Sequence, residues 1–292
     1  MAFRKCLECG RGIGGAKHCS YCGCVWEDSN PVYEKGLKFF DKQDYKRAVE
    51  CFLKAAKKEY VPAFNKLGYC YEFGMGVAQD YSMTVHWYLK ATEKGYAPAQ
   101  NNIGRCYYNG LGIKQDFTQA YRWFIRAAEN GNTEALNNLG CCYYYGNGVK
   151  QDSYQAIEYF RKAAENGNAD AQHNLGCCYM SGYGGARDYE EAVKYLTAAA
   201  ESGHTEAQNN LGDCYAYGYG VAIDYQKAFS WYSKSATGGS ICAQNNLGEC
   251  YFYGEGVKID YNKAAFWFKK SADRGLEGAK RNLEQCLKKI KE

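Results

Sequence analysis

Four cysteines near the N-terminus have the spacing of a metal site. They form two Cys-x2-Cys-Gly motifs, and their members are Cys6, Cys9, Cys19 and Cys22. Two residues between thiolates let one tight turn present both sulfurs to a single ion, and two such turns complete a tetrahedral shell. The pattern predicts a structural Zn2+, with iron or unmetallated thiols as alternatives. A closed four-sulfur shell leaves no open position for a catalytic water.

This segment also resembles a known module. The stretch CLECGRGIGGAKHCSYCG is similar to the short zinc ribbon found at the N-terminus of many bacterial proteins. His18 stands where that module usually has an aromatic residue, and Cys24 is an additional thiol; we interpret both as bystanders. We therefore expect a zinc ribbon and linker over residues 1–31, whose folding energy comes from metal binding because the segment is short and contains few apolar residues.

The rest of the chain repeats one pattern with a fixed period of 36 residues. The pairs that mark it are Leu67-Gly68, Ile103-Gly104, Leu139-Gly140, Leu175-Gly176, Leu211-Gly212 and Leu247-Gly248. A fixed period in this range is typical of stacked repeats, because one repeat cannot bury its apolar face alone. The period therefore indicates a solenoid.

Each repeat encodes two helices. In residues 97–132, small and apolar residues at helical spacing predict a first helix over 97–109, and Gly110–Gly112 turns the chain. Asp116 is placed to cap a second helix, and Gly131 is placed to end it. The repeats also share a cysteine column at Cys70, Cys106, Cys142, Cys178, Cys214, Cys250 and Cys286, which we interpret as buried core thiols.

This pattern resembles the Sel-one-like repeat, a 36-residue relative of the tetratricopeptide repeat. The resemblance implies an all-α fold, a right-handed superhelical solenoid of antiparallel helix hairpins. We expect a degenerate tetratricopeptide-like first hairpin at 32–60, six repeats at 61–276 and a C-terminal capping helix at 277–292. We expect the zinc ribbon to precede this solenoid.

Composition argues against several classes of protein. The repeats carry nearly balanced charge within a chain of net charge +4, so no basic stripe of nucleic-acid type follows them. No apolar run is long enough to span a membrane, and the N-terminus lacks the apolar core of a signal peptide. Sixteen cysteines without an export signal favour a reducing compartment, so we expect a cytoplasmic protein. Neither His-Glu-x-x-His nor Ser-x-x-Lys occurs, and we expect no enzyme activity.

One column on the first helix does not serve the core. Asparagine precedes the Leu-Gly pair, or its variant, at Asn102, Asn138, Asn174, Asn210 and Asn246. An amide donates and accepts at once, which matches a peptide group, and superhelical tetratricopeptide proteins use an asparagine here to hold an extended peptide. The alternative, equally weighted, is that these amides bond neighbouring helices.

Varied side chains share this helical face. They include Arg105, Tyr108, Tyr144, Tyr145, Asp213, Tyr217, Glu249 and Phe252. Aromatic anchors on a regular scaffold suit a binding groove, so we expect a non-enzymatic scaffold that binds a protein or peptide on the concave solenoid face. A nucleic-acid adaptor acting through the ribbon and the basic first hairpin is the alternative. A β-lactam-type hydrolase is a weaker one, because the motifs do not support it.

Overall fold

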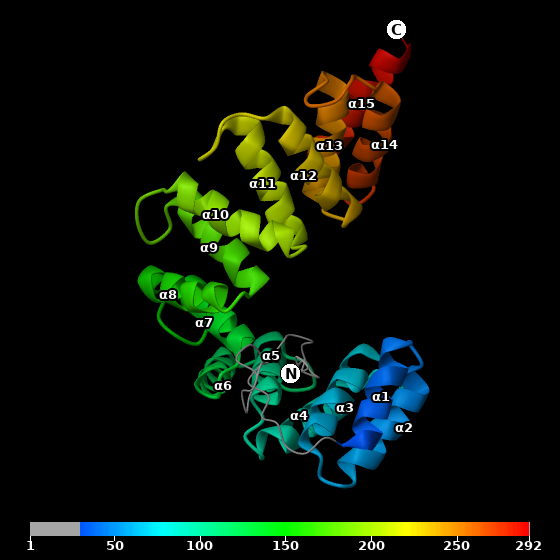
Figure 1. Cartoon of the computed structure of the whole chain (residues 1–292), viewed down its shortest axis with the longest axis vertical. Helices are drawn as coiled ribbons and strands as arrows, with labels where there is room; N and C mark the ends of the chain where they lie inside the picture. The colour runs from blue at the N-terminus through cyan, green and yellow to red at the C-terminus, as the bar shows by residue number, and fades with distance from the viewer. Residues whose placement is uncertain (1–29, 292) are drawn as a thin grey trace, which may run out of the picture. The chain divides into compact units, whose positions relative to one another are not determined.

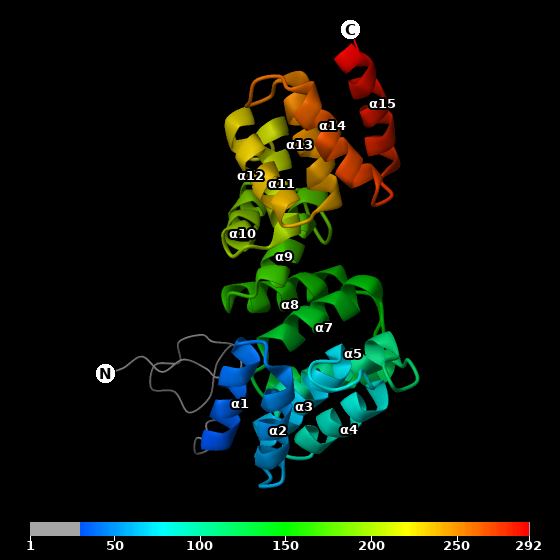
Figure 2. The ribbon, with the colours of Figure 1, turned by 90° about the vertical axis from the view of Figure 1, so that its right-hand side faces the viewer.

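The structure is a computed structural model that describes residues 30–291. The four predicted zinc ligands therefore lie outside the described residues. Residues 30–291 contain fifteen α-helices and no β-strand. The chain divides into two compact units, an N-terminal unit up to Asn166 and a C-terminal unit from Gly167, and each is described by itself (Figures 1 and 2).

The N-terminal unit consists of four helix hairpins that pack in chain order. Each odd-numbered helix pairs with the next helix, and each hairpin contacts the following one. The helices are α1 (Pro31–Asp41), α2 (Tyr45–Ala56), α3 (Val61–Phe73), α4 (Tyr81–Thr92), α5 (Ala97–Asn109), α6 (Phe117–Glu129), α7 (Thr133–Tyr145) and α8 (Ser153–Glu165). We call the odd-numbered helix the first helix of its hairpin and the even-numbered helix the second.

The C-terminal unit repeats the arrangement with three hairpins and a final unpaired helix. Its helices are α9 (Ala169–Ser181), α10 (Tyr189–Glu201), α11 (Thr205–Tyr217), α12 (Tyr225–Thr237), α13 (Ile241–Tyr253), α14 (Tyr261–Ala272) and α15 (Glu277–Lys291). Helix α15 packs mainly against α14. None of the helices among residues 30–291 is both long and apolar enough to cross a membrane.

The predicted helix ends are confirmed. The Asp116 carboxylate accepts a hydrogen bond of 2.9 Å from the backbone N–H of Gln119, which satisfies one orphan donor of α6. Aspartate caps the second helix of the other repeats in the same way, at Asp80, Asp152, Asp188, Asp224 and Asp260. Gly110 follows α5 with a φ of 71°, a left-handed conformation that glycine adopts without strain.

The glycine of each Leu-Gly pair lets the two helices of a hairpin approach. A Cβ built on Gly140 would lie 2.5 Å from the ring of Phe160, closer than any real Cβ contact. Phe160 is almost fully buried there. The core cysteine Cys142 packs in the same cluster as the corresponding ring of the preceding repeat, Phe124. The same contact recurs between Gly68 and Tyr88, Gly104 and Phe124, Gly176 and Leu196, Gly212 and Tyr232, and Gly248 and Phe268.

Helix α15 departs from this pattern. At the position that corresponds to the glycine it carries Glu284, which is exposed. Its apolar contacts with the preceding hairpin are made instead through Leu283 and the buried Cys286. The helix thus closes the core of the C-terminal unit without offering a place for a further ring.

Successive repeats approach each other through the second glycine of the turn. Gly112 has a φ of 67°, and a Cβ built on it would lie 2.1 Å from the carbonyl oxygen of Tyr81 in the preceding repeat. Gly110 in the same turn also has a positive φ, but its nearest neighbour would be 3.4 Å away. Both positions favour glycine because their φ angles are positive. Only at Gly112 is the absence of a side chain also required for the contact between repeats.

We therefore expect Gly112→Ala to destabilise the protein more than Gly110→Ala. Each substitution forces alanine into the left-handed region, at about 1–2 kcal/mol. Gly112→Ala adds a clash with backbone that cannot move freely, a further cost of about 2 kcal/mol. Urea unfolding followed by circular dichroism measures the difference, and equal midpoints for the two variants would show that the close approach is unimportant.

Candidate partner-binding face

The predicted groove residues that the structure describes lie on the first helices of the hairpins. We call the surface that these first helices form within each unit the partner-binding face of that unit. In the N-terminal unit it is carried by α3, α5 and α7, and in the C-terminal unit by α9, α11, α13 and α15. Because the i, i+3/i+4, i+7 spacing holds along each helix, the asparagine, charged and aromatic positions share one side of it.

The asparagine side chains connect neighbouring repeats. In the N-terminal unit, Asn138 Nδ2 donates to Asn101 Oδ1 at 2.8 Å, and Asn102 Nδ2 donates to Asn65 Oδ1 at 3.0 Å. The C-terminal unit contains the same bond three times, from Asn210 to His173 (3.1 Å), from Asn246 to Asn209 (3.1 Å) and from Asn282 to Asn245 (3.0 Å). Of the two sequence-based alternatives, the bond between helices is the one that the structure contains.

These bonds leave part of three of the amides available, whereas the carbonyl oxygen of Asn102 accepts a hydrogen bond from Arg105 at 3.4 Å. Asn138, Asn210 and Asn246 are half-buried, and their Oδ1 atoms accept no hydrogen bond from residues 30–291. Asn174 is also half-buried, on α9. In Asn138, Asn210 and Asn246 the bond to the neighbouring repeat fixes the side chain, so the carbonyl oxygen is held in a defined orientation without being used.

We expect Asn138→Ala to lower stability. The substitution removes the donor to Asn101, which is only 1% exposed, and a buried acceptor left unpaired costs about 1–3 kcal/mol. Asn109→Ala, at the exposed end of α5, is the matched control and should change the free energy of unfolding by less than about 0.5 kcal/mol. Chemical denaturation of both variants tests this, and equal stability would mean that the amide bond contributes nothing.

His173 replaces asparagine in one repeat and creates a small polar cluster in the C-terminal unit. Its ring stacks on that of His204 at 4.5 Å, and its Nε2 lies 3.4 Å from the sulfur of Cys177. Burial, together with the charge of His204, lowers the pKa of His173 to about 4. His173 is therefore neutral near pH 7 and can accept the hydrogen bond from Asn210.

Arg105 forms an ion pair in the N-terminal unit. Its guanidinium donates to Glu72 Oε1 at 3.0 Å, and the other carboxylate oxygen of Glu72 accepts from the hydroxyl of Tyr88 at 2.7 Å. Glu72 is buried at 5% exposure, so both oxygens need these partners. The burial and the Glu72 charge together raise the pKa of Tyr88, which keeps its hydroxyl a donor.

The C-terminal unit contains a similar buried hydroxyl but no matching cation. Tyr232 donates to Asp213 Oδ1 at 2.6 Å. Asp213 also accepts from two asparagine amides and forms no ion pair with the described residues. Burial raises the pKa of Asp213, and the negative charge of Glu249 adds to the effect.

The aromatic residues of the partner-binding face fall into two groups. Tyr108, Tyr144 and Phe252 pack against their own hairpins; the Tyr108 ring, for example, meets Phe117 edge-on at 5.1 Å. Tyr145 and Tyr217 are exposed by 65% and 62%. Among these predicted residues, only Tyr145 and Tyr217 can contact a partner with most of their surface.

Sequence reasoning missed the acids and hydroxyls beneath this face. Glu72 was not among the expected site residues, nor were Tyr88 and Tyr232. Their signal was present, because tyrosine replaces phenylalanine or leucine at the ring position in two repeats, and each of these repeats has an acid on its first helix. A buried tyrosine hydroxyl needs an acceptor.

Metal-binding clusters and reactive thiols are two further kinds of site that the described residues can be checked for. No group of three His, Cys, Asp or Glu side chains between residues 30 and 291 is arranged to hold a metal ion. The cysteine column is buried as predicted, and burial raises the pKa of Cys106 and of Cys142 to about 12. These thiols are therefore protonated near neutral pH and are poor nucleophiles.

The architecture of repeated two-helix hairpins defines the class of protein. The Sel1 repeat model matches residues 32–60, 62–96, 97–132, 133–168, 169–204, 205–240 and 243–276, so the chain belongs to the Sel1 repeat family. The match includes the first hairpin, which the sequence pattern had marked as degenerate. Sel1 repeat proteins are generally protein–protein interaction scaffolds.

Three solved structures are similar to this chain, and the first of them supports the family assignment. The chain is 32% identical to a Sel1 repeat protein from Oxalobacter formigenes, covering 83% of this chain and 97% of that one with a TM-score of 0.72. It is 30% identical to a protective antigen of uropathogenic Escherichia coli with an SLR fold (87% and 71% covered, TM-score 0.38). An immunity protein from Pseudomonas aeruginosa, at 19% identity, shares the fold (73% and 83% covered, TM-score 0.55). A search of curated proteins gave no match.

Proposed function

We propose that this protein is a non-enzymatic scaffold that binds an extended polypeptide on the partner-binding face. The observation that carries the proposal is a set of three asparagine amides, those of Asn138, Asn210 and Asn246, each fixed by a bond to the neighbouring repeat and each with a carbonyl oxygen that accepts no bond from the described residues. Such an oxygen can accept a hydrogen bond from a partner's backbone N–H. The exposed Tyr145 and Tyr217 supply apolar contact area beside it.

The spacing of the repeats suits an extended chain. Neighbouring helices pack about 8–10 Å apart, whereas an extended chain advances about 3.3 Å per residue. One asparagine therefore meets every third residue of the partner, approximately. The backbone would provide affinity at these points, and the varied side chains between them would select the sequence.

We expect the intact chain to select peptides from a phage-displayed library of random linear sequences. Tyr145→Ala or Tyr217→Ala should then weaken binding of the selected peptides by about tenfold, which corresponds to about 1.4 kcal/mol. Isothermal titration calorimetry with synthetic peptides measures this loss.

Tyr154→Ala is the matched control, because Tyr154 is equally exposed (71%) but lies on a second helix, α8. The Tyr154→Ala variant should bind the selected peptides with the same affinity as the unmodified protein. If Tyr154→Ala weakens binding while the other two variants do not, the binding surface lies on the second helices and the proposal is wrong.

We also propose that Cys6, Cys9, Cys19 and Cys22 bind a structural Zn2+. These residues lie outside the described part of the chain, and the proposal rests on their chemistry. Four thiolates at Cys-x2-Cys spacing match the tetrahedral sulfur shell that zinc prefers. The ribbon would be an accessory module that precedes the repeats.

Metal analysis of the purified protein should return about one zinc per chain. The double variant Cys9→Ser, Cys22→Ser should lose the metal, while its helical circular dichroism stays nearly unchanged because the fifteen described helices lie between residues 31 and 291, away from these cysteines. Cys51→Ser, which alters a cysteine of α2, is the control and should keep its zinc. Equal zinc in all three proteins would refute the site.

A further inference from the structure

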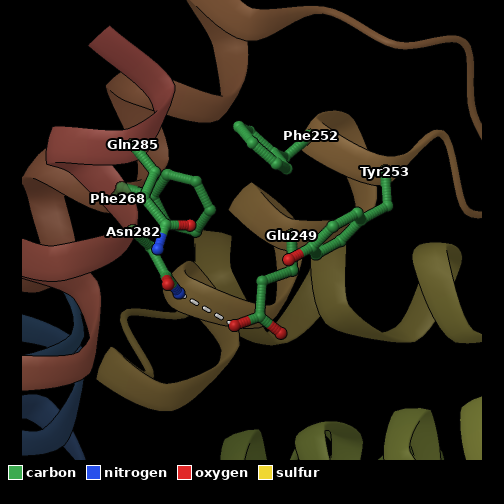
Figure 3. A pocket seen from close by; sticks show the side chains of 6 residues that line it. All are labelled: Glu249, Phe252, Tyr253, Phe268, Asn282 and Gln285. Carbon is green, nitrogen blue, oxygen red and sulfur yellow. Dashed lines mark hydrogen bonds between the residues drawn. The ribbon is translucent and has the colours of Figure 1, made fainter. Parts of the chain in front are cut away.

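A pocket opens on the partner-binding face of the C-terminal unit. It is lined by Glu249, Phe252 and Tyr253 of α13, Phe268 of α14, and Asn282 and Gln285 of α15. Figure 3 shows the Glu249 carboxylate and the Asn282 amide joined by a hydrogen bond, with the aromatic side chains around them. The pocket thus combines one carboxylate, two amides and three aromatic rings.

The carboxylate of Glu249 is held in place but only half used. Its Oε1 accepts two hydrogen bonds of 2.9 Å, from Asn245 and from Asn282. Its Oε2 accepts none from residues 30–291, and Glu249 forms no ion pair with them. One oxygen therefore orients the group, and the other is available to a ligand.

The N-terminal unit has a cation at the position that corresponds to Glu249, and the C-terminal unit does not. Arg105 occupies the same column as Glu249 and neutralises the buried Glu72. In the C-terminal unit this column holds two acids, Asp213 and Glu249. They lie close enough for the charge of Glu249 to raise the pKa of Asp213.

Nearby lysines do not compensate these charges. The described lysine ion pairs on α12, α14 and α15 join Lys227 to Asp224, Lys263 to Asp260 and Lys280 to Glu277. Each joins residues three apart at the start of a helix. Asp213 and Glu249 are therefore left without a cationic partner among the described residues.

The aromatic walls favour the same kind of ligand. Tyr253 is 62% exposed and Phe252 lies beside it, with ring centroids 4.9 Å apart. Aromatic faces attract cations, and they also pack against the methylene stems of long basic side chains. An uncompensated carboxylate next to the exposed ring of Tyr253 and the half-buried ring of Phe252 is complementary to lysine or arginine.

We propose that this pocket binds a lysine or arginine side chain of the polypeptide partner. The proposal rests on the proposed function, because it names the chemistry that one site on the partner-binding face selects. The stem of the basic residue packs on Phe252 and Tyr253, and its cationic group donates to Glu249 Oε2. The partner is therefore a polypeptide with a basic residue at one defined position.

The test compares peptide selection by the intact chain and by Glu249→Gln, which keeps the shape and removes the charge. Random linear peptides displayed on phage are selected against both proteins, together with Glu201→Gln as a control of equal charge change at an exposed site on α10. The unmodified protein and the control should enrich lysine or arginine at one fixed position. Glu249→Gln should lose that preference and bind the selected peptides about tenfold more weakly.

A charge exchange separates recognition from structural damage. Glu249→Lys should bind a selected peptide whose basic residue is replaced by glutamate better than it binds the original peptide. If peptides are enriched without a basic position, or if Glu249→Gln keeps the preference, the pocket assignment is wrong while the scaffold function stands. If none of the three proteins retains any peptide, both are wrong.

Discussion

The close approach of a second-helix side chain to a bare glycine backbone holds each hairpin together. Where Phe160 covers Gly140, the two helices are nearer than any side chain at position 140 would permit. This contact places the ring fully in the core. Because it recurs at the same position in each hairpin, it also sets the orientation of the first helix. That orientation determines where the asparagine column and the exposed tyrosines Tyr145 and Tyr217 point. The partner-binding face thus depends on a residue that has no side chain.

The asparagine column gives the repeats a second, polar connection. The bond from Asn138 to Asn101 joins two repeats on the side away from the aromatic core. A single amide can serve both stability and binding because it has more hydrogen-bonding groups than the inter-repeat bond uses. Such sharing explains how an asparagine, a mediocre helix former, is useful at the same place in consecutive repeats.

Periodicity predicted most of the architecture. The 36-residue spacing located the hairpins, and the Asp116 and Gly131 positions located helix ends, because these features depend on local backbone chemistry. The site was less accessible to sequence reasoning. Whether Asn138 meets a neighbour or a ligand depends on the spacing between repeats, which one repeat does not encode. The pairing of Glu72 with both Arg105 and Tyr88 likewise joins residues from different helices.

Glu284 has a consequence for the assembly of the chain. Stacked repeats present open ends, and an open end that accepts another copy's helix leads to fibres. At α15 the ring-accepting glycine is replaced by an exposed carboxylate, so a helix of a second molecule would have to press an apolar side chain onto a charge. Among the described residues, α15 therefore lacks the bare backbone on which the other hairpins seat an apolar side chain, and it disfavours the packing of a further apolar helix at this position.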